Sequence, residues 1–354
     1  MIINQWLAAA HRGDAIGDNA RMLRDAFRDA GHISEIYALT IDTDLASDIR
    51  PWSDAAAGDG DVTIFHFALP SPMTRAFGAL PGARVLHYHN VTPAHFFAPY
   101  DPAGARLSIL AREELATLAD RTDLALGVSE FNRTELEALG FPRTGVLPIL
   151  VNTERLTQAR PVPALEKLLS DGLANVLFVG RIAPNKKIED HIRLAEQYKR
   201  YVDAYYRFIF VGRYDPRSRY FATIRALVAE YRMLSDRFWF VGGVPDDELA
   251  AYYRHAHAYV SLSEHEGFCV PLVESMAMDV PVLAYAAGAV PETLGGAGLT
   301  FAPKDLEQAA ELLGTLVYDQ SVRDAVLAGQ RRRLSDFSRD RLAPRLQALV
   351  DAVA

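Results

Sequence analysis

Short apolar runs alternate with amphipathic helical stretches from one end of the chain to the other. This alternation is typical of repeated strand–helix–strand units, whose strands lie parallel in a sheet with helices on both faces. The sequence therefore predicts an α/β fold with two doubly wound parallel sheets. The strands of the first series are expected at 2–6, 35–40, 62–68, 84–89, 124–128 and 145–148, and those of the second at 175–179, 206–211, 238–241, 258–262 and 281–285.

The length of the chain, 354 residues, favours two domains over a single core. A polar segment that carries prolines separates the two series of strands, and it predicts a linker at 156–172. The first domain then covers 1–155 and the second 173–336. Open parallel sheets bind ligands at the carboxyl ends of their strands, so the informative residues should follow strands directly.

Composition excludes several classes of protein. The net charge of −8 argues against a nucleic-acid partner, because phosphate neutralisation needs clustered Lys and Arg. The only cysteine, Cys269, excludes an internal disulfide framework, and no Cys/His spacing indicates a zinc site. No signal peptide and no apolar run of roughly 20 residues is present, so we expect a cytoplasmic protein whose membrane contact, if any, is peripheral.

Residues 263–277 follow an expected strand and read as a glycine-containing loop that opens into a helix. Pro271 suits a first helical turn, and the backbone N–H groups of 268–272 would then point unpaired toward a phosphate. Glu266 precedes the turn, where its carboxylate can accept hydrogen bonds from sugar hydroxyls. Glu274 lies in the first turns of the helix and can take a ribose diol. The alternative is that both acidic residues are only favourable helix caps.

A second loop, 178–187, also follows a strand and carries two cations. Arg181 and Lys186 are five residues apart and can clamp a diphosphate in place of a divalent metal. The alternative is a pair of exposed surface cations.

The first half offers weaker signals. Gly17 follows the opening strand in a two-glycine segment, 13–19, that is either a phosphate-approaching loop or an ordinary strand-to-helix turn. His87 and His89 share one side of a strand, where one of them can meet a reacting sugar or both can be packing residues.

Two further patterns resemble functional motifs by chance. The triplet 42–44 reads Asp-Thr-Asp, like the metal-binding triplet of metal-dependent glycosyltransferases, but such a triplet is close to noise in a chain with 45 acidic residues. Arg21, Arg24 and Arg28 share one side of the first helix, which can meet anionic lipid or, as we favour, form a solvated face.

Residues 261–285 resemble the Glu-x7-Glu signature of the family-four retaining glycosyltransferases, which have the GT-B fold of two Rossmann-like domains facing a central cleft. Residues 178–187 resemble the Gly-Arg…Lys diphosphate clamp of that family. The likeness extends to its base-binding turn at 241–249 and to further segments at 288–292, 127–135 and 87–97. The last of these segments is similar to a stretch found in bacterial polysaccharide enzymes, many of them mannosyltransferases.

This resemblance implies roles for individual residues. Arg181 and Lys186 would bind the donor diphosphate, Glu266 the transferred sugar and Glu274 the ribose. His89 would lie near the anomeric carbon, where it orients donor and acceptor, and it completes a catalytic set with Arg181, Lys186 and Glu266. Further donor contacts are implied for Gly17 (phosphates), Val244 (nucleobase), Gly267, Phe268, Cys269 and Val270.

The resemblance also implies where the last helix of the chain lies, and the sequence departs from the family pattern at two positions. Its last helix, expected at 337–354, would cross back to the first domain. Cys269 and Asp279 stand where the family usually has glycine.

The predicted function is that of a retaining, metal-independent hexosyltransferase. It would move mannose from GDP-mannose to a glycan or polyprenyl-diphosphate-linked acceptor in surface-polysaccharide synthesis, at the inner face of the membrane or free in the cytoplasm. The nucleotide sugar is a substrate, and no cofactor or metal is expected. The alternatives are a UDP-sugar-dependent retaining transferase, a GT-B epimerase or phosphorylase, and a non-catalytic nucleotide-sugar-binding protein.

Overall fold

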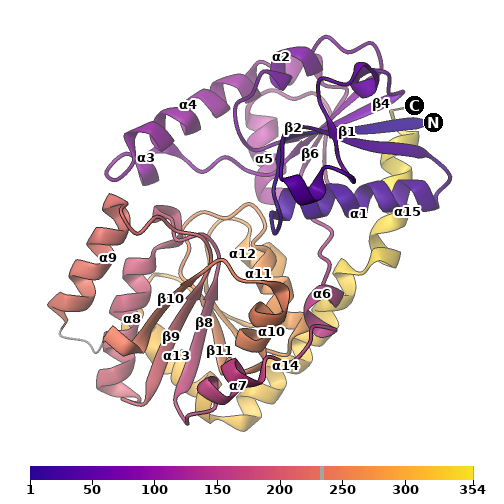
Figure 1. Cartoon of the computed structure of the whole chain (residues 1–354). Coiled ribbons are helices and arrows are strands. Elements are labelled where there is room, and N and C mark those ends of the chain that lie inside the picture. The colour runs from indigo at the N-terminus through magenta and orange to yellow at the C-terminus, as the bar shows by residue number, and fades with distance from the viewer. Residues whose placement is uncertain (232–234, 354) are drawn as a thin grey trace. The chain divides into compact units, whose positions relative to one another are not determined.

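The computed structural model describes residues 1–231 and 235–353, so Ala354, the end of the predicted crossing helix, lies outside the described residues. The chain forms two compact units (Figure 1). The first consists of residues 1–95, 103–152 and 337–354, and the second of residues 96–102 and 153–336. Each unit is built on its own parallel sheet, as the alternation of strands and helices predicts.

The sheet of the first unit has the strand order β3-β2-β1-β4-β5-β6-β7, and all its pairs are parallel. Its order reverses between β1 and β4, so the carboxyl ends of these two strands flank a topological switch point. The structure adds one strand to those predicted, the two-residue β3. The strands are β1 (Ile2–Ala10), β2 (Ile33–Ile41), β3 (Arg50–Pro51), β4 (Val62–Phe67), β5 (Ala83–Tyr88), β6 (Leu124–Gly127) and β7 (Thr144–Val146).

Helices cover both faces of this sheet, because successive side chains of a strand point to opposite faces and both sets are apolar. On β4, Phe65 and Phe67 pack with α2 (Met73–Phe77), α4 (Pro102–Ala116) and α5 (Glu130–Ala138). Val62 and Ile64 of the same strand pack with α1 (Ala15–Asp29) instead. The remaining short helices are α3 (Ala94–Phe97) and the 3-10 turns Thr43–Leu45, Ala55–Gly58 and Ala119–Arg121.

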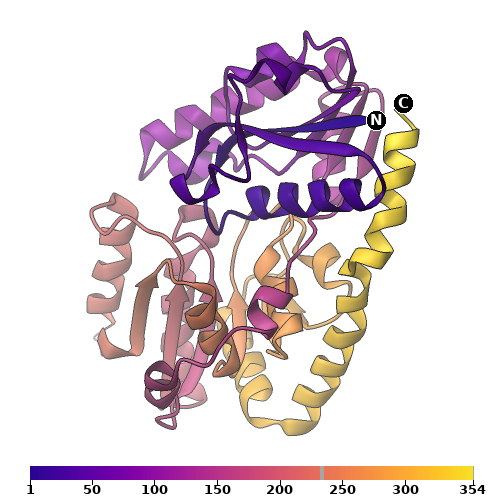
Figure 2. The ribbon, with the colours of Figure 1, turned by 45° about the vertical axis from the view of Figure 1, so that its right-hand side comes forward.

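The C-terminal helix, α15 (Arg339–Asp351), belongs to the first unit although it follows the second in sequence. Leu346 and Val350 of α15 join the core cluster of Leu23 and Phe27 on α1. Figure 2 shows α15 beside α1, with the two ends of the chain close together. Among the described residues, no helix has both the length and the apolar character needed to span a bilayer.

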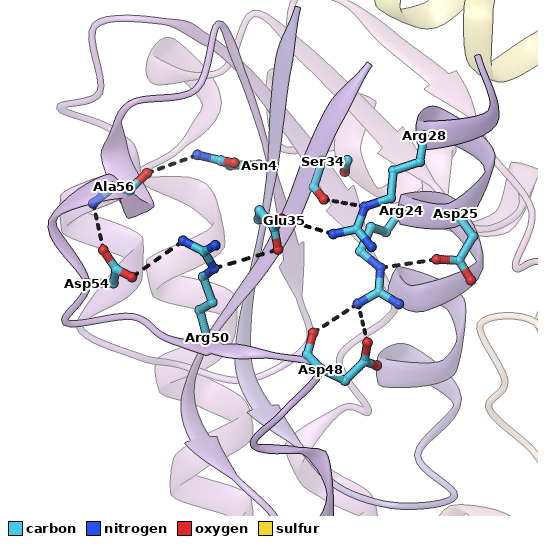
Figure 3. Close-up of polar contacts among 10 residues, drawn as sticks. All are labelled: Asn4, Arg24, Asp25, Arg28, Ser34, Glu35, Asp48, Arg50, Asp54 and Ala56. Atoms are coloured by element: carbon cyan, nitrogen blue, oxygen red, sulfur yellow. Dashed lines mark hydrogen bonds and ion pairs between the residues drawn. The ribbon is translucent and has the colours of Figure 1, made fainter. Parts of the chain in front are cut away.

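The arginine side of α1 is not the solvated face that we favour from the sequence. Arg24 is buried, and its guanidinium donates to the Asp48 carbonyl at 2.9 Å and to the Asp48 carboxylate at 2.7 Å (Figure 3). Arg28 donates to the Ser34 carbonyl at 2.9 Å and to Glu35 at 3.0 Å. The interpretation is wrong for Arg24 because Asp48, which comes from another segment and is invisible in the helix's own pattern, folds over it.

The sheet of the second unit has the order β10-β9-β8-β11-β12-β13, again with parallel pairs throughout. Its switch point lies between β8 and β11. The predicted strands are present, and one short edge strand, β13, is added. The strands are β8 (Ala174–Val179), β9 (Tyr206–Val211), β10 (Phe238–Gly242), β11 (Ala258–Ser261), β12 (Val282–Tyr285) and β13 (Leu299–Phe301).

The main core of the second unit joins its strands to α8 (Ile188–Tyr201), α9 (Arg219–Glu230) and α13 (Leu306–Tyr318). Two short helices, α6 (Glu154–Thr157) and α7 (Pro163–Leu169), lie in the segment 153–172 and pack against α10 (Asp246–Arg254). The other elements are α11 (Val270–Ala277), α12 (Val290–Leu294), α14 (Gln320–Leu334) and the 3-10 turns Pro184–Lys186, Ser235–Arg237 and Ser335–Phe337.

Candidate functional site

The candidate donor site lies at the switch point of the second sheet. The loop after β8 carries Lys186, and the loop after β11 carries Glu266. Because β8 and β11 are parallel neighbours, their carboxyl ends meet at one edge of the sheet. Two loops that are distant in sequence are therefore brought together by the strand order.

Asn185 joins these two loops. Its backbone carbonyl accepts a hydrogen bond from the Glu264 amide at 2.9 Å, and its side-chain Nδ2 donates to the His265 carbonyl at 3.1 Å. Asn185 is buried, so these bonds are shielded from water and hold the loops in register. No sequence pattern singles out Asn185, because an asparagine within a loop carries no periodic signal.

Lys186 and Glu266 contact each other directly. The Lys186 ammonium donates to Glu266 Oε1 at 2.5 Å, and Glu266 is buried with 7% of its surface exposed. An ammonium has three protons, so Lys186 can contact further oxygens while it holds Glu266. The Glu266 carboxylate likewise has acceptor positions left on Oε2. The pair can therefore serve phosphate oxygens and sugar hydroxyls at once.

A third loop, after β12, packs on the backbone of Glu266. The Ala289 amide donates to the Glu266 carbonyl at 3.0 Å. Gly288 has φ of 56°, and a Cβ there would lie 2.6 Å from the same carbonyl oxygen. Only glycine fits this close approach, which explains the glycine in the family-like segment 288–292.

Helix α11 begins beside Glu266 with its amide groups toward the loop. Pro271 lies in its first turn as predicted, and the N-cap residue is Cys269, whose side chain does not cap the helix. Among the described residues, the amides of Cys269 and Val270 have no hydrogen-bond acceptor, so they remain available to an anion. The expectation of unpaired amides across 268–272 is wrong at Leu272, which donates to the Cys269 carbonyl at 3.0 Å, and at proline, which has no N–H.

Glu274 lies on α11, buried with 3% of its surface exposed. The Tyr253 hydroxyl donates to its Oε2 at 2.8 Å, and the Arg155 guanidinium pairs with its Oε1. Burial raises the pKa of the Glu274 carboxyl, and the charge of Arg155 and the bond from Tyr253 oppose that shift. These two partners favour the ionised carboxylate that a ribose diol requires.

The other predicted residues of this unit lie on loops. Arg181 is exposed and forms no hydrogen bond or ion pair within the described part of the chain, but the charge of Asp101 acts on its guanidinium. Val244 is half-buried in the loop between β10 and α10. Gly267 and Phe268 lie in the buried loop between Glu266 and α11. The Phe268 carbonyl accepts a hydrogen bond from the Thr293 hydroxyl at 2.6 Å.

In the first unit, Gly17 lies within the first turn of α1 and not in a loop before it. Its amide donates to the side chain of Asp14, the N-cap residue, at 3.4 Å. His89 follows β5 directly and contacts His66 of β4, whose Nδ1 lies 2.9 Å from His89 Nε2.

The triplet 42–44 proves to be occupied by basic partners. Asp42 accepts hydrogen bonds from His11 at 2.8 Å and from the Arg12 amide at 3.0 Å, and Asp44 pairs with the Arg12 guanidinium. Each of the two carboxylates therefore has a partner within the protein.

These clusters also contain four residues that no sequence pattern singles out: Arg155, Tyr253, His66 and Gln5. Each contacts its partner across a long stretch of chain, 119 residues for Arg155 and Glu274 and 61 for Gln5 and His66. Neither local periodicity nor spacing signals such contacts. For Arg155 the only available clue was its place near the predicted linker.

Two doubly wound parallel sheets in one chain, with a cation and a helix terminus at the second switch point, define the GT-B fold. The fold agrees with that of HepE from Anabaena, solved in complex with UDP-glucose. The TM-score is 0.76 over 99% of this chain and 100% of that chain, at 16% identity. Residues 166–336, just under half of the chain, match the family "Glycosyl transferases group 1".

Curated proteins resemble the chain at low identity. O-antigen chain mannosyltransferase B of Escherichia coli is 26% identical over 224 residues, which are 62% of this chain and 58% of the relative. A GDP-mannose-dependent alpha-(1-6)-phosphatidylinositol monomannoside mannosyltransferase of Mycobacterium tuberculosis is 26% identical over 296 residues, 79% of this chain and 71% of the relative. The match thus spans little more than half of the Escherichia coli relative.

Proposed function

We propose that this chain is a group 1 glycosyltransferase, a retaining enzyme that transfers mannose from GDP-mannose to a glycan or polyprenyl-diphosphate-linked acceptor. The observation that carries the proposal is the Lys186–Glu266 pair at the switch point, next to the free amides at the start of α11. It combines a cation for the diphosphate with a carboxylate for sugar hydroxyls. The two mannosyltransferase relatives support mannose as the sugar.

The proposed chemistry follows from the charges. Departure of the nucleoside diphosphate develops negative charge, which Lys186, Arg181 and the amides of Cys269 and Val270 can stabilise. Fixed cations of this kind take the role that a divalent metal has in other transferases, and we propose that turnover survives chelation by EDTA. From the first unit, we propose that His89 acts at the transferred sugar and Gly17 at the donor phosphates.

A substitution of Lys186 tests this site. Lys186→Met removes the ammonium but keeps most of the side-chain volume, and we expect kcat to fall roughly 100- to 1,000-fold, the usual cost of one charge-stabilising donor. Lys199→Met is the matched control, because Lys199 lies on α8 and, within the described residues, pairs with Glu196 alone, at 3.8 Å. Transfer is measured by mass spectrometry of the acceptor. Unchanged turnover in Lys186→Met would falsify the assignment.

A UDP-sugar is the second candidate donor, because the HepE structure of the same fold contains UDP-glucose. A thermal-shift panel of GDP-mannose, UDP-glucose and ADP-glucose distinguishes them, since a ligand that binds only the folded state raises the Tm. We expect the largest rise with GDP-mannose. A larger rise with UDP-glucose reassigns the donor, and donor binding without transfer to any acceptor favours a binding protein over an enzyme.

A further inference from the structure

A cluster of three histidines lies at the switch point of the first sheet. His66 is on β4, His87 is on β5 and His89 follows β5, and the ring centroids lie 4.4–5.3 Å apart. Gln5 of β1, the strand on the other side of the switch point, contacts the cluster. The four side chains therefore come from the strand ends at which α/β sheets bind ligands.

The hydrogen bonds of Gln5 establish which nitrogen of His66 carries a proton. Gln5 Nε2 lies 3.0 Å from the Ala20 carbonyl, and only an amide NH2 can donate to a carbonyl. The Gln5 oxygen, Oε1, consequently faces His66 Nε2 at 2.9 Å. An amide oxygen only accepts, so His66 must carry its proton on Nε2.

The same reasoning extends to His89. Burial lowers the pKa of both His66 and His89 well below the ordinary value, so each ring is neutral and has a single proton. His66 Nδ1 is then an acceptor, and it takes a hydrogen bond from His89 Nε2 at 2.9 Å. His89 in turn keeps its lone pair on Nδ1, which is buried and has no partner among the described residues.

His87 presents a second acceptor in the same cluster. Its Nε2 donates to the Leu147 carbonyl at 2.9 Å, and burial lowers its pKa to about 4. Its Nδ1 is also buried without a partner in the described part of the chain. The cluster therefore holds two buried acceptor nitrogens that lack a donor, an unfavourable state that a donor group from a ligand would relieve.

We propose that Gln5 and His66 are positioning residues that hold His89 in the tautomer with its proton on Nε2, so that Nδ1 accepts a hydrogen bond from a substrate hydroxyl. The hydrogen-bond order Ala20–Gln5–His66–His89 sets this tautomer before any ligand binds. The inference rests on the proposed function for one step only, the placement of His89 at the sugar. The tautomer itself follows from the hydrogen bonds.

A metal site is the competing explanation, because one nitrogen from each histidine lies within 4.8 Å of the others. No carboxylate joins this group within the described residues, so a divalent cation there would be buried without a compensating charge. In addition, the relay uses both nitrogens of His66, and a metal would break the bond to His89. The relay explains the observed contacts without an ion.

Nitrogen-15 NMR of histidine-labelled protein tests the tautomer directly in the intact chain. In the wild type we expect His66 and His89 each to show a protonated Nε2 and an unprotonated Nδ1. Signals are assigned by their loss in His66→Leu and His89→Leu. A proton on His89 Nδ1 overturns the proposal, and this measurement needs no variant to be active.

The variant Gln5→Met removes the group that orients His66. We expect the His66 and His89 signals to average between the two tautomers. We also expect kcat to fall roughly 10- to 100-fold, which is the usual loss when a metal-ligating histidine loses the hydrogen-bond partner that orients it. The KM for the donor should stay within about 3-fold, because ground-state binding is retained. Unchanged tautomers in Gln5→Met, or a raised KM with an unchanged kcat, contradict the relay.

The matched control is Gln330→Met in the second unit. Gln330 is also buried and makes two backbone hydrogen bonds, to the Val282 amide at 2.9 Å and the Val280 carbonyl at 2.8 Å. Its loss should leave the His66 and His89 signals unchanged. If Zn²⁺ added at stoichiometric concentration shifts the NMR signals of all three histidines, the cluster is a metal site and the relay is rejected. Correct tautomers without transferase activity leave the relay intact and reject the proposed function.

Discussion

Among the described residues, four other than glycine have a left-handed backbone. Two of them stand where the family that the sequence resembles is expected to have glycine. Cys269 has φ of 70° and Asp279 has φ of 53°. The loop before α11 and the turn after it thus keep a glycine-like path without glycine. A side chain in this region costs about 1–2 kcal/mol, so both positions store strain. At Cys269 the strain lies at the candidate donor site, and at Asp279 it lies on the surface.

Asp279 allows this strain to be measured. It is exposed and pairs with Arg331 at 2.7 Å, so both Asp279→Gly and Asp279→Ala lose the same surface ion pair. We expect the glycine variant to be about 1–2 kcal/mol more stable than the alanine variant, because only alanine retains a Cβ at positive φ. Urea unfolding gives the difference in the free energy of unfolding. Equal stability of the two variants contradicts the strain.

An alanine substitution at Gly17 can distinguish a structural role of this glycine from a role in donor binding. A Cβ at Gly17 would meet only Asp14 Oδ2 and the His11 carbonyl, both at 3.9 Å, so alanine fits the ligand-free chain. We expect Gly17→Ala to be as stable as the wild type or up to about 1 kcal/mol more stable. If the donor phosphates approach the backbone at Gly17, the affinity of the Gly17→Ala variant for the donor falls about 10-fold or more, which calorimetry detects.

The control for Gly17 is Gly329→Ala, a helical glycine of the second unit with comparable free space, 3.9 Å to its nearest neighbours. It should change stability in the same direction and leave donor affinity unchanged. Unchanged affinity in Gly17→Ala as well removes Gly17 from the donor site.

At the scale of elements, the short helix α6 supports α11. Arg155 of α6 pairs with Glu274 of α11 and with Asp246 at the start of α10. Glu274 is far more buried than Arg155, with 4% against 24% of the side chain exposed. Loss of Arg155 therefore leaves a buried carboxylate without its cation, which is the costly way to break such a pair.

Arg155→Met should destabilise the second unit in a pH-dependent way. The folded pKa of Glu274 is already raised by burial and would rise further without Arg155. Below the ordinary carboxyl pKa the group is protonated in both states and the variant loses little. Between the ordinary carboxyl pKa and the raised folded pKa, the unfolded chain releases the Glu274 proton while the folded chain keeps it. The free energy of unfolding therefore falls as the pH rises. We expect a deficit of about 1–3 kcal/mol at pH 8 and a smaller one at pH 5, measured by urea unfolding.

The double variant Arg155→Met with Glu274→Gln controls for this interpretation. With a neutral amide at 274 the pH dependence of the deficit should disappear, because no buried carboxyl is left to ionise. A deficit that is equal at both pH values in the single variant assigns Arg155 to packing alone.

At the scale of the whole molecule, the chain returns to its first unit after completing the second. Leu346 on α15 is buried with 4% of its surface exposed, in the cluster with Ile3, Leu23 and Phe27. Leu346→Ala should lower the free energy of unfolding by about 2–5 kcal/mol, because it leaves a cavity in this core. It should also speed amide hydrogen exchange in β1 and α1, which pack on that core. The stability of the first unit thus depends on residues at the far end of the chain.

Leu327→Ala on α14 is the control, because Leu327 is buried in the second unit with 8% of its surface exposed. It should speed exchange in the second unit and leave β1 and α1 unchanged. If Leu346→Ala accelerates exchange in the second unit as much as in the first, α15 does not belong to the first core.

The sequence by itself determined what depends on neighbours along the chain. Alternating apolar runs predicted the parallel strands, and Pro271 marked the first turn of α11. Lys186 and Glu266 were found because each follows a strand directly, and parallel neighbours bring such positions together. The added strands β3 and β13 were missed because two or three residues are too few to show a period.

Only the tertiary structure decided the partners of the site residues. Arg155 on Glu274, Asn185 between the two loops, and Gln5 and His66 behind His89 all act across large separations in sequence. Arg24 became buried for the same reason, since Asp48 comes from another segment. Propensity and periodicity are local properties, whereas these contacts arise from strand order and chain reversal. The sequence could therefore name the charged residues of the donor site, but it could not show what orients them.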